Sequence, residues 1–319
     1  MEIRNIGTSG LRVSALGVGC NNFGGRLDQS ATTAVVHAAL DAGVTLFDTA
    51  DVYPMGDGGA SETFLAAGLG ARRKDVVLAS KFGMKMDPEG VKCGGSRRYI
   101  MAAVEDSLKR MGTDWIDLLQ FHAPDPLTPI DETIAALDDL IKAGKVRYVG
   151  SSNFSAWQVV EAQFVARELG ATRFIATQEA YSMLTRDVET DVIPVCQKYG
   201  LGVLPFFPLE SGVLTGKYHV GQTAPAGSRL AGSPRLAQKF QTDAKVAKAT
   251  QLNDIAKSAG LELTDLAFAW LLRDGVVPSV IAGASTPAQI ARNARAVTVT
   301  LDADLLARID ACLVSETLS

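Results

Sequence analysis

The sequence predicts an α/β fold in which eight parallel strands and the helices between them close a barrel. Two observations carry this prediction. Short apolar runs of strand length alternate with segments of helical periodicity almost from end to end. Eight such runs can be counted, which is the number that closes a (β/α)8 or TIM barrel. The 319 residues, 47% of them hydrophobic, are enough for one barrel with insertions, so we expect a single domain over residues 1–319.

A β-hairpin is predicted ahead of the barrel. Residues 3–6 and 11–13 are strand-like runs, and the four residues from Gly7 to Gly10 between them have the composition of a turn. We expect this hairpin to cover the bottom of the barrel. The barrel strands are predicted at residues 16–19, 45–48, 76–81, 117–121, 147–151, 176–178, 202–206 and 279–282.

Helices between the strands are indicated by apolar spacing and by end signals. Thr128 is predicted as an N-cap, with Pro129 at the first helical position and Gly144 at the end. One apolar face of this helix follows at Ile130, Ile134, Leu137 and Ile141. The same spacing predicts a helix face at Val188, Val192, Val195 and Tyr199, and a related spacing predicts one at Met101, Val104, Leu108 and Met111.

One segment breaks the alternation of strands and helices. Residues 219–244 are rich in glycine and proline and poor in apolar side chains. Compact domains seldom carry so long a loop without a use for it, so we expect a mobile flap among long loops on the C-terminal face of the barrel. The alternative is a disordered surface insertion.

Composition argues against several function classes. The net charge is −4 without a basic block, which predicts no nucleic-acid partner and no membrane surface, and favours a small-molecule substrate. The four cysteines are dispersed without a C-x-x-C pair and there are only three histidines, so no metal site is expected. Neither a signal peptide nor a membrane span is indicated, and we expect a cytoplasmic protein.

Four polar residues stand at the ends of three predicted strands. They are Asp48, Tyr53, Lys81 and His122. The C-terminal ends of barrel strands meet on one face, so these side chains are expected to converge in one pocket. A nearby ammonium lowers the pKa of a phenol, and such a group can transfer protons.

Three of these residues also have a purely structural interpretation. Asp48 could be a helix cap, Tyr53 a half-buried amphipathic side chain, and His122 a hydrogen-bonded core histidine. Their joint placement at the ends of different strands favours the functional interpretation, because function concentrates there in barrels.

Seven motifs, in order along the chain, resemble those of the aldo-keto reductases over essentially its whole length. They are Phe47-Asp48-Thr49-Ala50 with Tyr53; Ser80-Lys81; Gly112-Thr113-Asp114 leading to His122; Gly150-Ser151-Ser152-Asn153; Thr177-Gln178; Pro208-Leu209 with Ser211-Gly212 and Gly216-Lys217; and Gly283-Ala284-Ser285 with Gln289 and Asn293. The resemblance implies that Tyr53 is the general acid, that Lys81 lowers its pKa, that Asp48 holds Lys81, and that His122 orients the carbonyl.

The resemblance also implies a nicotinamide cofactor. Ser152, Asn153 and Gln178 would bind its carboxamide, and Phe206 would stack on the ring, where relatives usually have tyrosine. Further contacts are implied at Phe207, Pro208, Leu209, Ser211, Gly212, Lys217, Gly283, Ala284, Ser285, Gln289, Arg292 and Asn293. Lys217 and the backbone amides of residues 283–285 would bind the pyrophosphate.

Arg292 stands where the family commonly has a glutamate. A guanidinium there favours a 2′-phosphate, so we expect NADP(H), with NAD(H) as the alternative. No G-x-G-x-x-G element follows a strand near the N-terminus, so a Rossmann domain is not predicted.

The resemblance therefore predicts a reversible, NADPH-dependent carbonyl reductase (EC 1.1.1.-). The alternatives are an alcohol or sugar dehydrogenase that works oxidatively, and a regulatory subunit that binds NADPH with little turnover. Candidate apolar walls of the substrate pocket are Phe23, Met55, Phe82, Met84, and Trp115 or Phe154, and the glycine-rich residues 55–59 could reshape its mouth. The substrate and the oligomeric state are not predicted.

Overall fold

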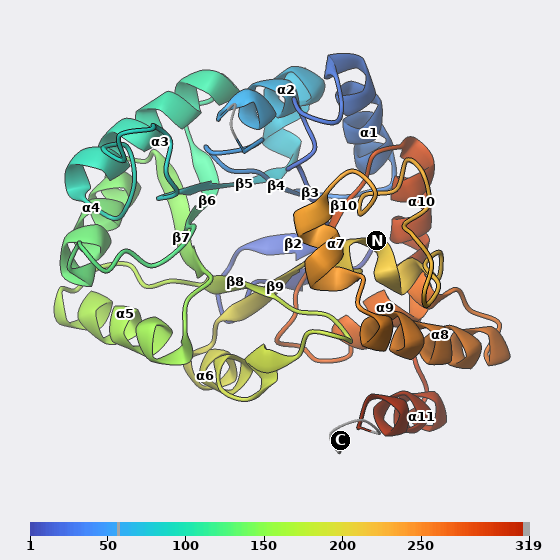
Figure 1. Cartoon of the computed structure of the whole chain (residues 1–319). Helices are drawn as coiled ribbons and strands as arrows, with labels where there is room; N and C mark the ends of the chain where they lie inside the picture. Colours follow the sequence, from blue (N-terminus) through green and yellow to red (C-terminus); the bar gives the residue numbers. More distant parts are fainter. Residues whose placement is uncertain (56–57, 315–319) are drawn as a thin grey trace.

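The computed structural model describes residues 1–55 and 58–314, and it confirms the barrel. Eight parallel strands form one sheet in the order β10-β3-β4-β5-β6-β7-β8-β9. Figure 1 shows the helices around the outside of these strands. The strands are β3 (Leu16–Gly19), β4 (Leu46–Asp48), β5 (Val77–Phe82), β6 (Ile116–Phe121), β7 (Val146–Ser152), β8 (Ala176–Ala180), β9 (Gly202–Phe206) and β10 (Val280–Gly283).

The register of the strands brings the predicted site residues to one level. Asp48 pairs with Gly19 of β3, and Lys81 of β5 pairs with Gln120 of β6. Ser152 and Gln178 are partners across β7 and β8. The strands β9 and β10 lie next to each other and bring the two ends of the sheet together. Residues from distant parts of the chain therefore reach the same face.

The N-terminal hairpin is also confirmed. Strands β1 (Ile3–Asn5) and β2 (Arg12–Ser14) pair antiparallel. Ile6 and Val13 are fully buried in a cluster with apolar side chains from six barrel strands, so the hairpin covers the bottom of the barrel. Gly7 (φ +54°) fits tightly here, because a Cβ at this position would lie 2.2 Å from the carbonyl oxygen of Gly200.

Helices cover the outside of the barrel, and a second apolar core lies between them and the strands. None of the described helices is long and apolar enough to cross a membrane. The α-helices are α1 (Gln29–Asp41), α2 (Ala60–Leu69), α3 (Arg97–Met111), α4 (Ile130–Lys142), α5 (Ala156–Glu168), α6 (Val192–Tyr199), α7 (Pro234–Phe240), α8 (Asp243–Ser258), α9 (Leu263–Leu271), α10 (Pro287–Ala296) and α11 (Ala303–Val314), and the 3-10 helices are η1 (Gly70–Asp75), η2 (Asp187–Glu189) and η3 (Glu210–Thr215).

Two details of the helix predictions are wrong. Pro129, not Thr128, is the N-cap of α4, and the Thr128 hydroxyl donates to Asp125 instead. Val188 belongs to the separate turn η2, and α6 begins only at Val192. Pro194 has no N–H to donate and is tolerated in the first turn of a helix, which explains a helix start close before it.

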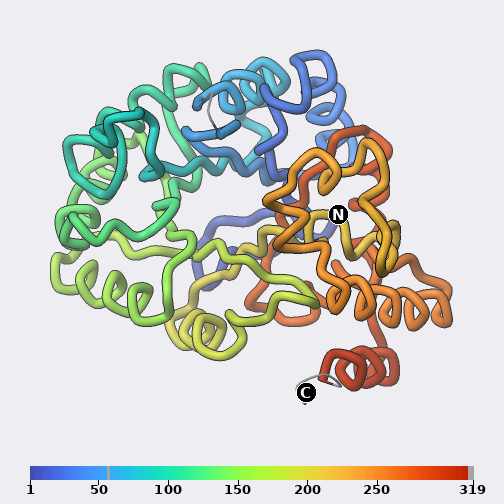
Figure 2. Tube along the Cα trace, viewed as in Figure 1, coloured from blue at the N-terminus to red at the C-terminus, as the bar shows by residue number. Residues whose placement is uncertain are grey.

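The segment 219–244 lies over the C-terminal face, as predicted. Gly227, Ser228, Arg229 and Arg235 of this segment line the same pocket as the strand ends. The segment also contains a helix, α7, that the sequence pattern did not indicate. In Figure 2 the orange part of the trace crosses in front of the yellow and blue strands at this place.

Candidate active site

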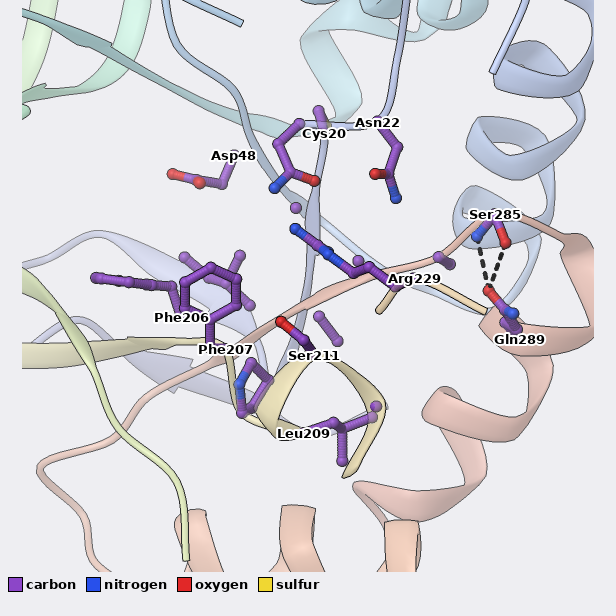
Figure 3. Close-up of a pocket in the computed structure, with 18 of the residues that line it drawn as sticks. Cys20, Asn22, Asp48, Phe206, Phe207, Leu209, Ser211, Arg229, Ser285 and Gln289 are labelled. Carbon is purple, nitrogen blue, oxygen red and sulfur yellow. Dashed lines mark hydrogen bonds between the residues drawn. The ribbon is translucent and has the colours of Figure 1, made fainter. Parts of the chain in front are cut away.

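One large pocket opens at the C-terminal ends of the strands, with a volume of about 520 Å³. Figure 3 shows a close-up of it. The structure brings together all of the predicted site residues except Lys81 as lining of this pocket: Asp48, Tyr53, His122, Ser152, Asn153, Gln178, Phe206, Phe207, Pro208, Leu209, Ser211, Gly212, Lys217, Gly283, Ala284, Ser285, Gln289, Arg292 and Asn293.

Lys81 lies behind the pocket wall and is 1% exposed. Its Nζ donates to Asp48 Oδ2 at 2.7 Å and to the carbonyl oxygen of Thr49 at 2.9 Å. Burial alone would lower the pKa of Lys81, but the Asp48 carboxylate outweighs burial and raises it. The lysine is therefore a charged ammonium held in the barrel.

Asp48 is the centre of a larger set of hydrogen bonds. Its Oδ1 accepts from Gln120 Nε2 at 3.1 Å and from Gln178 Nε2 at 2.9 Å, while Oδ2 accepts from Lys81. Both carboxylate oxygens are thus bound by donors from three different strands. This arrangement fixes the ammonium in position and satisfies a buried charge.

Tyr53 and His122 face each other beside this ion pair. Their rings meet edge to face with centroids 5.6 Å apart, and Lys81 Nζ lies 5.3 Å from the Tyr53 ring centroid. The phenol, the imidazole and the ammonium therefore form one compact group. His122 Nδ1 is buried without a hydrogen-bond partner among the described residues.

The pKa of Tyr53 differs from the sequence-based expectation, which was that Lys81 lowers it. Burial raises the pKa of Tyr53, and Lys81 lowers it only in part, so the net pKa lies above its ordinary value. Burial, with a smaller effect of Lys81, lowers the pKa of His122 to about 3. At neutral pH the site therefore holds a protonated phenol, able to donate, and a neutral imidazole.

The turn after β7 carries the two residues expected at a carboxamide. Ser152 Oγ donates to the backbone oxygen of Gln178 at 2.8 Å, and Asn153 Nδ2 donates to the backbone oxygen of His122 at 2.9 Å. Asn153 has φ of +59°, a left-handed conformation that few residue types adopt. Both side chains are thus fixed at the pocket wall before any ligand arrives.

The turn after β9 is strained. Phe207, Glu210 and Ser211 all have positive φ, between +49° and +56°. Fully buried Glu210 accepts from Lys245 Nζ at 2.6 Å, which connects this turn to α8. Ser211 Oγ is buried without a hydrogen-bond partner among the described residues and lines the pocket. An unpaired hydroxyl in such a place is suited to a ligand oxygen.

At α10 the structure modifies the predicted anion site. The backbone N–H of Ser285 donates to Gln289 Oε1 at 2.7 Å, as the dashed lines in Figure 3 show, so this amide is already used. Arg292 and Asn293 face the same pocket from the next turn of the helix. Arg292 Nε is buried and has no partner in the described part of the chain.

Sequence reasoning missed three cationic residues of the pocket: Arg26, Arg229 and Arg235. Figure 3 shows Arg229 extending across the centre of the view between Asn22 and Ser211. Burial and Arg26 lower the pKa of Arg229, and burial, Arg292 and Arg26 lower that of Lys217. These cations are close enough to repel one another, which indicates a strongly anionic ligand. Arg229 and Arg235 could have been found from the sequence, because both arginines lie in the segment 219–244 that was expected to cover the C-terminal face.

Most of the predicted apolar walls are wrong. Of the six candidates, Met84 lines the pocket. Phe23, Phe82 and Phe154 are buried in the core, and Met55 is 68% exposed. The guanidinium groups of Arg73 and Arg147 lie 4.8 and 5.5 Å from the ring centroid of Trp115. The predicted glycine-rich mouth includes residues 56 and 57, which lie outside the described residues. In residues 1–55 and 58–314 no group of side chains has the arrangement of a metal site.

The fold and the site together define a β/α-barrel protein with a tyrosine, a histidine and a buried lysine–aspartate pair at the C-terminal ends of its strands. The sequence profile described as the aldo/keto reductase family matches residues 15–314, and the chain belongs to this family.

Relatives from three kinds of organism are similar to nearly the whole chain. A probable voltage-gated potassium channel subunit beta of Oryza sativa subsp. japonica is 39% identical over 308 residues, 94% of this chain and 92% of that protein. The L-glyceraldehyde 3-phosphate reductase of Escherichia coli is 35% identical over 320 residues, 97% of this chain and 92% of that protein. An uncharacterized oxidoreductase of Bacillus subtilis, YrpG, is 35% identical over 318 residues, 96% of this chain and 94% of that protein.

Proposed function

We propose that this protein is an NADPH-dependent reductase of aldehydes or ketones that also oxidises the matching alcohols, with residues 1–319 as one domain. The single observation that supports this most strongly is the shared pocket. One cavity is lined both by Tyr53 and His122, with Lys81 behind its wall, and by several cationic side chains. A small carbonyl compound fits the first part, and a dinucleotide with several phosphates fits the second.

The residues present fit such a cofactor. Ser211 Oγ and Arg292 Nε are buried donors without partners among the described residues, and each needs an acceptor. Five of the described lining side chains are cationic, namely Arg26, Lys217, Arg229, Arg235 and Arg292, which suits a pyrophosphate and a 2′-phosphate. Ser152, Asn153 and Gln178 would hold the carboxamide, and Phe206 would lie against the ring. When bound, the reduced nicotinamide supplies hydride to the carbonyl carbon.

The side chains of the pocket supply the other half of the reaction. Tyr53 would donate its phenolic proton to the carbonyl oxygen, and in the oxidative direction it would accept the proton from the alcohol. Lys81 would stabilise the phenolate that results, and Asp48 keeps Lys81 charged. Neutral His122 would donate one hydrogen bond that orients the carbonyl.

Cofactor preference depends on Arg292 in this proposal. Arg292→Glu should reduce the preference for NADPH over NADH by about 10- to 100-fold, since a charge-assisted hydrogen bond contributes about 1.5–3 kcal/mol. Fluorescence titration with each cofactor measures this, and NADH affinity is the internal control because NADH lacks the 2′-phosphate. An unchanged preference would show that another residue binds this phosphate.

The reductase proposal is tested by following NADPH absorbance with a panel of aldehydes, including a neutral aromatic aldehyde and glyceraldehyde 3-phosphate. We expect turnover with at least one of them. Tight NADPH binding without turnover would favour the second candidate, a regulatory subunit that binds NADPH. The similarity to potassium channel subunits over 94% of the chain supports that candidate.

A further inference from the structure

Glu179 is a buried carboxylate directly behind the carboxamide turn. It follows Gln178 in β8, and because side chains alternate along a strand it points away from the pocket. It is 7% exposed. Its Oε1 accepts from the backbone N–H of Phe154 at 3.1 Å and from Thr177 Oγ1 at 2.7 Å. The carboxylate thus binds the turn that Ser152 and Asn153 belong to.

The surroundings of Glu179 contain donors but no counter-charge. Among the described residues no lysine, arginine or histidine contributes to the pKa shift of Glu179, and a titratable group beside it is the thiol of Cys196 on α6. Burial raises the pKa of Glu179 to about 7, although the Thr177 hydroxyl and the backbone N–H groups of Phe154 and Asn153 act in the opposite direction. A buried charge without an ion pair is costly, so its hydrogen bonds matter to the structure around it.

The backbone that these bonds hold is strained. Asn153 has φ of +59°, and a non-glycine residue in this region persists only where the surroundings stabilise it. Backbone N–H groups of the turn donate two hydrogen bonds to β8. The Phe154 N–H donates to the Glu179 carboxylate, and the Asn153 N–H donates to the backbone oxygen of Gln178 at 3.1 Å. The first depends on a side chain and can be removed by mutation.

We infer that Glu179 is a positioning residue for the cofactor, and that its carboxylate holds residues 152–154 in the conformation that presents Ser152 and Asn153 to the nicotinamide carboxamide. This inference rests on the proposed function. All groups around the carboxylate are donors, so a protonated Glu179 holds the turn less well. Its pKa is raised above the ordinary 4.5, so the carboxylate form is lost as the pH falls through about 7.

The test compares two ligands in three proteins: the unmodified protein, Glu179→Gln, and the matched control Ser151→Ala. Ser151 is buried and donates to Thr177 Oγ1, which donates in turn to Glu179, so the Ser151 hydroxyl is one hydrogen bond removed from the carboxylate. Dissociation constants are measured for NADPH and for 2′-phospho-ADP-ribose, which lacks the nicotinamide. At pH 8, Glu179→Gln should bind NADPH about 10-fold more weakly and bind 2′-phospho-ADP-ribose unchanged, while Ser151→Ala should bind both normally.

The pH dependence gives a second, independent measurement. In the unmodified protein the affinity for NADPH relative to 2′-phospho-ADP-ribose should fall between pH 8 and pH 6, and in Glu179→Gln the ratio should be flat. The fragment corrects for titration of the 2′-phosphate, which both ligands carry. Because the pH dependence is measured in the unmodified protein, it tests the role of Glu179 even if the variant Glu179→Gln does not fold.

Four outcomes overturn the inference. The first is an affinity ratio that stays constant with pH in the unmodified protein. The second is an equal loss of affinity for both ligands in Glu179→Gln. Either result means that Glu179 does not act through the turn that faces the nicotinamide carboxamide. Failure of the unmodified protein to bind NADPH at all overturns the proposed function and this inference with it. Normal NADPH binding with turnover but no effect of Glu179→Gln overturns the inference alone.

Discussion

Tyr53→Phe is expected to lower kcat by at least about 10²-fold while leaving the dissociation constant for NADPH unchanged. The phenol is the half-buried, protonated donor of the pocket, and general acid catalysis contributes on the order of 10²–10⁴-fold. Phenylalanine keeps the ring that packs against His122 and lies near Lys81. Only the proton donor is therefore removed. Single-turnover absorbance measurements at saturating NADPH give the rate of the chemical step directly.

The matched control for this experiment is Tyr99→Phe. It removes a phenol that donates to Asp51 at 3.1 Å, outside the pocket. Its kcat should stay within a few-fold of the kcat of the unmodified protein. The comparison then distinguishes the loss of the general acid from the loss of a phenolic hydroxyl elsewhere in the protein. Equal kcat in the unmodified protein and Tyr53→Phe would remove Tyr53 from the chemistry and favour the regulatory candidate.

Asp48→Asn is expected to have the largest effect on stability, a loss of about 3–5 kcal/mol in the free energy of unfolding. It leaves the ammonium of Lys81 in the barrel without its counter-charge, and breaking a buried ion pair by removing one partner has a cost of this size. The new amide also replaces an acceptor that binds Gln120 and Gln178 with a group that has only one acceptor atom. Urea unfolding measured at equilibrium gives the change.

The double variant Asp48→Asn with Lys81→Met tests the cause of that loss. Removing both charges should restore most of the stability, since neutral replacement of a buried ion pair is often close to neutral in energy. Activity should stay low, because Lys81 is also needed beside Tyr53. A double variant no more stable than Asp48→Asn alone would show that the amide contacts, not the ion pair, carry the stability.

The barrel could be predicted because the sequence patterns that indicate its strands and helices lie within short stretches of the chain. Eight apolar runs and the helical spacing between them are visible in short windows, and the polar residues that end the runs are visible with them. The level at which Asp48, Lys81 and Gln178 meet follows from the rule that parallel strands share one C-terminal face. The motif resemblance then implied the cofactor contacts, which line one pocket in the structure.

The errors at the site concern features that depend on contacts between distant parts of the chain. Arg229 reaches the pocket because a long segment folds back over the barrel, and composition does not encode that path. Phe82 was expected in the pocket wall but stacks on Phe121, with centroids 4.9 Å apart, since the alternation of side chains directs it outward from β5. The effect of burial on the Tyr53 pKa likewise depends on the finished core.

The order of the site residues along the chain has a consequence for how this protein can change. The proton-transfer group lies within residues 48–122, and the side chains that line the cofactor channel beyond it come mainly from residues 152–293. Under the proposed function, proton transfer and cofactor choice therefore depend on separate stretches of sequence, and each could be altered while the other stays intact. Gln178 joins the two stretches, because its amide in the second holds the carboxylate of Asp48 in the first. Exchange of barrel halves between relatives would have to preserve this hydrogen bond and the one from Asn153 Nδ2 to the backbone oxygen of His122.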